Sequence, residues 1–312
     1  MDAVFIGGLI REARQQLGMS QEKLCEGLCE PITILRIENG QTDSSRSMRL
    51  ALLQKLGLPE RYLYFPSQKE LEIDDLKAEA RAQTIAFGKA AKADRAERRE
   101  SALQALHALE KKAGKKDILI RQFIMAERIG LGTEEGPYSP SEQREQLLDA
   151  IYVTNSKFDL DQMGSFRYTQ AEIELINQIA ITYALEGNRD AAISIYRQLL
   201  TYIQENNQQL HYYAGQLTMV TFNYVRELVA MEKYEEAIAI AEVGRKVCVK
   251  YDNHQLHPQL LAILANCYAH LGNREKSRKF YERAFCMYEA FEDLNNLAHL
   301  RNDAEDTLGL DL

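Results

Sequence analysis

The 312-residue sequence has no tryptophan, only six prolines and five cysteines, and no run of 18 consecutive apolar residues. The missing apolar run excludes a membrane-spanning helix. The N-terminus carries Asp2 and no basic stretch followed by an apolar one, so we expect no secretory signal. Five cysteines without paired spacing favour a reducing compartment. These absences together predict a cytoplasmic protein that does not bind membranes.

Proline is rare enough to indicate the fold class. After Pro140 only Pro258 interrupts the chain, and alanine, leucine, glutamate and glutamine are common. Few prolines, many helix-forming residues and little β-branched alternation predict an all-α protein.

The net charge of −8 does not suggest nucleic-acid binding for the molecule as a whole, but it is unevenly distributed. Residues 1–66 are neutral, 67–76 carry −3, 77–122 carry +6 and 123–312 carry −11. This asymmetry predicts a neutral head, a basic neck and an acidic body with different surfaces.

Apolar residues at helical spacing predict four helices in the head, over residues 6–17, 21–28, 31–39 and 48–56. Gly18 is placed to end the first helix, and Ser20 to cap the second. Pro31 is typical of a first helical turn. Two short helices joined by a tight turn form a helix-turn-helix, whose second member lies in the DNA major groove.

The head resembles the Xre/Cro-like helix-turn-helix family through three spaced motifs, which are Arg14-x6-Gln21-x2-Leu24, Ile34-x2-Ile37-Glu38-Asn39-Gly40 and Leu52-x3-Leu56-Gly57. Its turn is one residue shorter than the commonest pattern and contains Cys29, which resembles the RRNPP family of peptide-pheromone regulators. The resemblance implies a partly buried ion pair between Arg14 and Glu38 that holds the recognition helix in place.

The resemblance also implies which residues contact DNA. The groove-facing positions are Pro31, Ile32, Thr33 and Arg36, with Gln21 near a phosphate. Lys23, Arg46 and Arg49 are further candidates for phosphate contact. Ile32 and Leu35 stand where polar residues are usual, so two interpretations stay open: apolar contact with thymine methyl groups, or a head that binds DNA weakly or contacts protein instead.

The body contains internal repeats. Small residues recur at Ala192, Ala237 and Ser277, in segments that resemble tetratricopeptide repeats. Their separations of 45 and 40 residues exceed the usual repeat length of about 34. Further helical pairs are predicted over 71–90 with 94–112 and over 117–129 with 141–154, and a capping helix over 295–308. Capping boxes are expected at Ser139-x2-Glu142 and Thr169-x2-Glu172.

We therefore predict a helix-turn-helix domain over residues 1–66, a linker over 67–76 and a superhelical tetratricopeptide-like repeat domain over 77–312. A solenoid of this kind has a concave face that suits an extended peptide. On the repeat register that face carries Asn177, Asn223, Arg226 and Asn266. The RRNPP resemblance implies that the three asparagines clamp a peptide backbone. The guanidinium of Arg226 is suited to a carboxylate at the C-terminus of the ligand or on an acidic side chain. Alternatively, these asparagines are simply solvated.

Other reactive residues indicate little chemistry. Cys248, Cys267 and Cys286 fall in apolar helical runs and are expected in the core. His254 and His257 are expected at the surface, without a third metal ligand in spacing. The basic neck is interpreted mainly as the solvated outer face of helices. We found no motif for a metal, a cofactor or catalysis, so we expect a protein that is not an enzyme.

Two functional hypotheses follow. The first is a homodimeric transcription regulator of the quorum-sensing type, whose head binds a double-stranded DNA operator and whose repeats bind a short signalling peptide. The second is a protein-interaction module that sequesters a partner protein and whose head binds DNA weakly or is vestigial. Selection of a DNA motif by the head separates the two.

Overall fold

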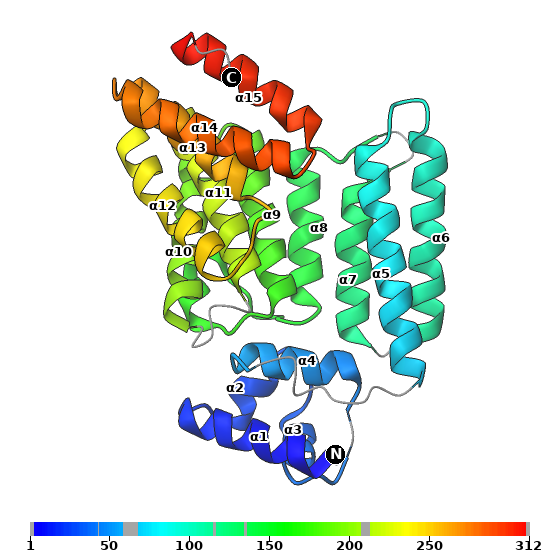
Figure 1. The fold of residues 1–312 in the computed structure, drawn as a ribbon. Coiled ribbons are helices and arrows are strands. Elements are labelled where there is room, and N and C mark those ends of the chain that lie inside the picture. Colours follow the sequence, from blue (N-terminus) through cyan, green and yellow to red (C-terminus); the bar gives the residue numbers. More distant parts are fainter. Residues whose placement is uncertain are drawn as a thin grey trace. The chain divides into compact units, whose positions relative to one another are not determined.

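A computed structural model describes residues 3–42, 44–58, 68–114, 117–133, 136–206 and 213–309 of the chain. These residues form helices and no strand, as expected from the composition (Figure 1). None of the helices within these ranges is both long and apolar enough to cross a bilayer. The chain divides into two compact units, residues 1–182 and 183–312.

The first unit begins with four short helices, which are α1 (Ala3–Gln16), α2 (Gln21–Cys25), α3 (Pro31–Glu38) and α4 (Arg46–Lys55). We call these helices the head. They match the predicted helices, and Gly18, Gly40 and Gly57 follow three of them with φ of 61°, 66° and 67°. Helix α2 ends three residues earlier than predicted, because the chain turns at Gly27 with φ of 76°.

The head has its own apolar core. Among the core side chains with no exposed area are Ile10, Leu24, Ile34, Leu52 and Leu53. Helix α1 lies against α3, and the approach is closest at Gly7, where a Cβ atom would lie 1.9 Å from the carbonyl oxygen of Ile37. Glycine at this position therefore allows the first helix to support the recognition helix directly.

The rest of the first unit consists of helical hairpins. Its elements are α5 (Gln68–Lys89), α6 (Arg95–Ala113), α7 (Ile118–Leu131), α8 (Pro140–Tyr152), the 3-10 segment η2 (Leu160–Ser165) and most of α9 (Gln170–Leu185). Both predicted capping boxes are confirmed, at Ser139 with Glu142 and at Thr169 with Glu172. The predicted head boundary lies outside the described residues. Residues 68–76 of the predicted linker form the start of α5.

The head packs against these hairpins within the first unit. Leu119 of α7 packs against the head core. At Gly27 in the turn between α2 and α3, a Cβ atom would lie 1.1 Å from the carbonyl oxygen of Thr154. Only glycine therefore fits this close to the Thr154 carbonyl at this turn. Within the head, Lys55 of α4 is buried and donates to the backbone carbonyl of Glu26 at 2.7 Å.

Thr154 also belongs to a buried polar network of the first unit. Its hydroxyl donates to Glu172 Oε1 at 2.7 Å and accepts from Gln122 Nε2 at 2.6 Å. Glu172 also accepts the backbone N–H of Thr169 at 2.7 Å, as part of the capping box. The carboxylate of Glu172 is fully buried, and these hydrogen bonds offset the cost of removing it from water.

The second unit begins near the end of α9 and continues through α10 (Arg189–Asn206), α11 (Ala214–Ala230), α12 (Tyr234–Lys250), α13 (His257–His270), α14 (Arg274–Ala290) and α15 (Leu294–Leu308). The repeat alignment is confirmed, since α10, α12 and α14 each begin with an aligned segment. Their small residues Ala192, Ala237 and Ser277 are fully buried. Helix α15 forms the predicted last helix and packs on α13 and α14.

Candidate functional site

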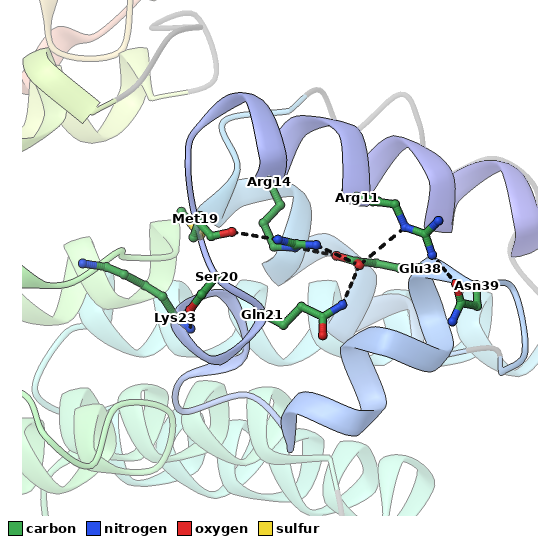
Figure 2. Close-up of polar contacts among 8 residues, drawn as sticks. All are labelled: Arg11, Arg14, Met19, Ser20, Gln21, Lys23, Glu38 and Asn39. Carbon is green, nitrogen blue, oxygen red and sulfur yellow. Dashed lines mark hydrogen bonds and ion pairs between the residues drawn. The ribbon is translucent and has the colours of Figure 1, made fainter.

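A buried carboxylate holds the recognition helix α3 in place. Glu38 at its C-terminal end receives Arg14 Nε at 2.6 Å and Arg14 Nη2 at 3.0 Å. Gln21 Nε2 donates to the same carboxylate at 2.7 Å, and Arg14 also donates to the carbonyl of Met19 at 2.8 Å. Figure 2 shows these side chains converging from α1 and α2 on α3. The bidentate pair therefore joins α1 to α3, and the hydrogen bond from Gln21 adds α2.

The electrostatics agree with this geometry. The Glu38 side chain is 1% exposed. Burial by itself raises the pKa of Glu38, but hydrogen bonds from Arg14 and Gln21 outweigh burial, so the pKa lies below its ordinary value. The hydrogen bond to Glu38 raises the pKa of Arg14. Both groups therefore stay charged at neutral pH.

The outward face of α3 is exposed to solvent. Ile32 is 50% exposed and Leu35 is 39% exposed, which are high values for apolar side chains. Arg36 is also exposed, and Pro31 and Thr33 are partly exposed. Pro31 begins the helix, and its N-cap residue provides no side-chain acceptor. The predicted groove-facing residues therefore share one accessible surface.

The predicted phosphate contacts have partners inside the first unit. Arg46 forms an ion pair with Asp74 at 2.7 Å, and Arg49 forms one with Glu70 at 2.8 Å, both on α5. Gln21 bonds to Glu38, as described above. The sequence did not indicate these pairings.

Lys23 points away from the Glu38 cluster (Figure 2). Its Nζ donates to the backbone carbonyl of Ser165 at 3.2 Å. The basic side chains Lys23, Arg46 and Arg49 thus contact acidic groups of α5 or a carbonyl group of η2.

The predicted peptide-binding residues differ in their accessibility. Asn177 on α9 is fully buried, whereas Asn223 on α11 is partly exposed. Arg226, also on α11, is exposed and lies with its guanidinium 5.7 Å from the ring centre of Phe222. Asn266 on α13 donates to Asp303 of α15 at 3.4 Å. Within the second unit, α11 and α13 are in contact. The binding roles of these residues stay predictions.

A cavity of about 450 Å³ in the first unit is lined by residues for which the sequence motifs predict no site. It is lined by α4, α5, α7 and α9, with Lys77, Arg81 and Phe123 in its wall. Lys77 Nζ lies 4.9 Å from the centre of the Phe123 ring, and burial lowers the pKa of Lys77. Arg81 is paired with Glu127 at 2.6 Å and Glu174 at 3.1 Å. Lys77 has no such ion pair among the described residues.

A second cavity of about 320 Å³ shares Arg81, Phe123 and Glu174 with the first. The sequence signal for this region was the i, i+4 spacing of Lys77 and Arg81, which places both on one helix face. The basic neck is predicted mainly as the solvated outer face of helices, whereas Lys77 and Arg81 line these cavities. Lys77 therefore supplies a cation beside an aromatic wall, a combination that suits a carboxylate attached to an apolar group.

Within the described parts of the chain, no group of three or more histidine, cysteine, aspartate and glutamate side chains is placed to hold a metal ion.

Comparison with known protein families agrees with this architecture. Residues 10–63 match a helix-turn-helix family model, so the chain carries a helix-turn-helix domain. Residues 154–300 match the model of the RNPP family C-terminal domain. Both matches confirm the resemblances inferred from the motifs. None of the curated proteins compared with the chain matches it.

Solved structures share the fold. PlcR from Bacillus thuringiensis, in complex with the peptide PapR7 and DNA, is 17% identical with a TM-score of 0.58, over 95% of this chain and 99% of that chain. The apo form of PlcR gives 18% identity and a TM-score of 0.56, over 95% and 98%. The competence regulator ComR from Streptococcus vestibularis, in complex with its signalling peptide XIP, gives 18% and 0.50, over 97% and 98%. Because these structures are only 17–18% identical to the chain, their similarity shows a shared fold alone.

Proposed function

We propose that this protein is a cytoplasmic, homodimeric and non-enzymatic transcription regulator that binds an operator through α3 and a short signalling peptide through its repeat helices. One observation carries the proposal: the exposed face of α3 is fixed by the Arg14–Glu38–Gln21 cluster in a chain with an RNPP-family body. The solved relative PlcR, which binds both a peptide and DNA, supports the same division of roles.

DNA recognition would use two kinds of contact. Arg36 and Thr33 offer hydrogen-bond donors to base edges, and Ile32 offers an apolar surface for a thymine methyl group. Two-fold symmetric dimers read paired half-sites, so we expect an operator with inverted repeats.

The DNA test is selection from a random duplex library at low salt, followed by sequencing. The wild type should enrich one motif, and Arg36→Ala should relax or abolish the selection. Arg128→Ala on α7 is the control, because Arg128 is also an exposed arginine but lies outside the head. If the wild type enriches no motif, the regulator function is wrong.

Peptide binding would use both asparagines and cations. Asn223 is partly exposed and Arg226 is exposed, and both lie on α11. We expect Asn223 to bond to the peptide backbone and Arg226 to pair with a peptide carboxylate. Asn177 is buried, so it would contact a peptide only after a rearrangement of its surroundings.

Calorimetry with short secreted peptides of the host tests this second role. Asn223→Ala should abolish or strongly weaken binding, and Arg226→Met should weaken a peptide with a free C-terminus more than its C-terminal amide. Gln104→Ala on α6 is a control at an exposed amide. Peptide binding that survives replacement of all three predicted asparagines would contradict the assignment.

The alternative function, sequestration of a partner protein by the body, is favoured by one observation. Lys23, Arg46 and Arg49 already have partners in the first unit, which leaves fewer cations for DNA phosphates. Under this alternative the duplex library yields no motif, while the protein still binds a partner through its repeats.

A further inference from the structure

Three buried polar side chains of the first unit form a hydrogen-bonded network that neither proposed role uses. Gln122 of α7 is 1% exposed, and Thr154 and Glu172 have no exposed area. Gln122 Nε2 donates to Thr154 Oγ1 at 2.6 Å, and the Thr154 hydroxyl donates to Glu172 Oε1 at 2.7 Å. We call these three residues the buried network. A hydroxyl that has one donor and one acceptor as neighbours keeps a single orientation, so the network holds Thr154 in one place.

The first connection from the buried network to the head is steric. A Cβ atom at Gly27 would lie 1.1 Å from the carbonyl oxygen of Thr154 and 2.2 Å from its carbonyl carbon. Gly27 belongs to the turn between α2 and α3, where the N–H groups of Leu28 and Cys29 donate to the carbonyl of Cys25 at 2.8 and 3.1 Å. Because packed atoms cannot overlap, a shift of Thr154 toward Gly27 displaces this turn.

The second connection is electrostatic and involves Lys55 of α4. The Lys55 side chain is 5% exposed, and its Nζ donates to the carbonyl of Glu26 at 2.7 Å. Burial lowers the pKa of Lys55, and the charge of Glu172 is the largest of those that oppose this effect. The carboxylate of the buried network therefore attracts the ammonium group that holds the residue before Gly27.

Gln122 belongs to the network without belonging to the contact with the head. Its amide donates to Thr154 and, at 3.0 Å, to the carbonyl of Ala150. Among the described residues it forms no hydrogen bond with the head. Gln122 also lines both cavities of the first unit. A change at this position therefore reaches the head through Thr154.

We propose that Gln122 and Thr154 are positioning residues for DNA recognition. By holding the Thr154 carbonyl against Gly27, they set the position of the turn between α2 and α3, and with it the position of α3. The inference rests on the proposed function, because it assigns the body a part in operator binding by the head. A molecule in either cavity would adjoin Gln122, which gives the body a route to the recognition helix.

Four variants of the full-length protein test the network. Thr154→Val keeps the side-chain size and removes the hydroxyl, whereas Thr154→Ser keeps the hydroxyl. Gln122→Met keeps the side-chain length without the amide. Thr182→Val is the matched control, because Thr182 is also fully buried and donates to the carbonyl of Ile179 at 2.7 Å, outside the network. Circular dichroism checks that each variant folds.

The first measurement is hydrogen exchange, which needs no DNA. The amides of Leu28 and Cys29 report on the turn, and the amides of α1 report on the stability of the whole head. In Thr154→Val and in Gln122→Met the two turn amides should exchange about tenfold faster, as expected for the loss of one buried hydrogen bond. Exchange in α1 should not change. Thr154→Ser and Thr182→Val should leave the turn as it is in the wild type.

The second measurement is affinity for the duplex that the wild type selects, by fluorescence anisotropy. Thr154→Val and Gln122→Met should each weaken binding about tenfold, because the turn no longer holds α3 in one position. The double variant should bind no more weakly than Thr154→Val, since Gln122 acts through Thr154. Thr154→Ser and Thr182→Val should bind as the wild type does.

Several outcomes would overturn the inference. One is turn exchange in Thr154→Val that equals that of Thr182→Val, and another is additive losses of affinity in the double variant. Equal acceleration in α1 and in the turn would mean general destabilisation of the head. A loss in Thr154→Ser as large as in Thr154→Val would assign the effect to packing instead of the hydroxyl.

Failure of the proposed function gives a different result. A wild type that selects no duplex removes the regulator function, whereas faster exchange confined to the turn would still support the positioning of α3 by the buried network. Selection of a duplex together with unchanged turn exchange in Thr154→Val would leave the regulator function standing and contradict the inference.

Discussion

Glu38 shows how single residues determine the head. A carboxylate that is 1% exposed is stable only because it receives hydrogen bonds from Arg14 and Gln21. The three side chains come from α1, α2 and α3, so their bonds fix the relation between the supporting helices and the recognition helix. In the proposed function, Arg14 and Glu38 would position α3 for DNA without contacting DNA themselves.

Replacing Arg14 by methionine should destabilise the head strongly. The substitution keeps much of the side-chain volume but leaves the Glu38 carboxylate without its main partner. Removal of one partner from a buried pair typically costs about 3 kcal/mol or more. Urea unfolding monitored by circular dichroism measures the loss. Arg36→Met is the control, because Arg36 is exposed, and it should change stability little; equal losses in the two variants would contradict a structural role for the pair.

The same carboxylate predicts a pH dependence. The pKa of Glu38 is lowered in the folded protein, so the unfolded chain binds more protons as the pH falls below 4.5. The stabilisation from ionised Glu38 is therefore complete above pH 4.5 and is lost as the pH falls through the folded-state pKa. As the pH falls from neutral to below the folded-state pKa of Glu38, the unfolding free energies of the wild type and of Glu38→Gln should approach each other. A difference that stays constant over this range would mean that Glu38 contributes no linkage.

At the scale of elements, the turn between α2 and α3 does more than connect two helices. Gly27 has φ of 76°, a backbone conformation that favours glycine, and it also lies against the carbonyl oxygen of Thr154. Gly18, which ends α1, has a similar φ of 61°, but a Cβ atom there would meet nothing within 4 Å. Substitutions at Gly18 and Gly27 therefore separate the effect of a strained backbone from the effect of contact with Thr154.

The two alanine variants should therefore differ. Gly18→Ala should lose about 1 kcal/mol of stability from the left-handed backbone alone. Gly27→Ala should lose clearly more, because its methyl group forces the turn away from Thr154. Thermal unfolding measures stability, and hydrogen exchange of the amides near Thr154 should accelerate only in Gly27→Ala. Equal effects of the two substitutions would argue that the close approach does not constrain the turn.

At the scale of the whole molecule, the net charge hides opposed local surfaces. The neutral head carries basic residues, but Arg46 and Arg49 are paired with Asp74 and Glu70 of α5. These acidic residues come from the short segment of charge −3 that follows the head in the sequence. The proposed DNA affinity therefore depends on how far these pairs release their arginines to phosphates.

Neutralising the two acids tests this dependence. In the double variant Glu70→Gln with Asp74→Asn, operator affinity at low salt should rise. Its salt dependence should also steepen, since each additional phosphate contact changes the slope of log K against log salt by about 1. Fluorescence anisotropy over a salt series measures both quantities. Glu275→Gln with Glu289→Gln on α14 removes the same charge from the body and should leave the slope unchanged.

Local patterns in the sequence were sufficient to predict most elements. The glycines after α1, α3 and α4 and the N-cap Ser20 indicated the head helices, and the small residues at 192, 237 and 277 indicated where α10, α12 and α14 begin. The pairing of Arg14 with Glu38 was predictable because it belongs to a family motif. All of these signals act over short distances in the chain or are carried by a known spacing.

Tertiary structure alone decided what the charged and polar side chains contact. Arg49 meets Glu70, Lys23 meets the carbonyl of Ser165, and Lys77 lines a cavity beside the Phe123 ring. His257 was expected at the surface but is buried at the start of α13. Cys286 was expected in the core but lies on an exposed face of α14. The physical reason is that helical periodicity assigns a residue to a face, whereas burial and pairing depend on which distant segment packs against that face.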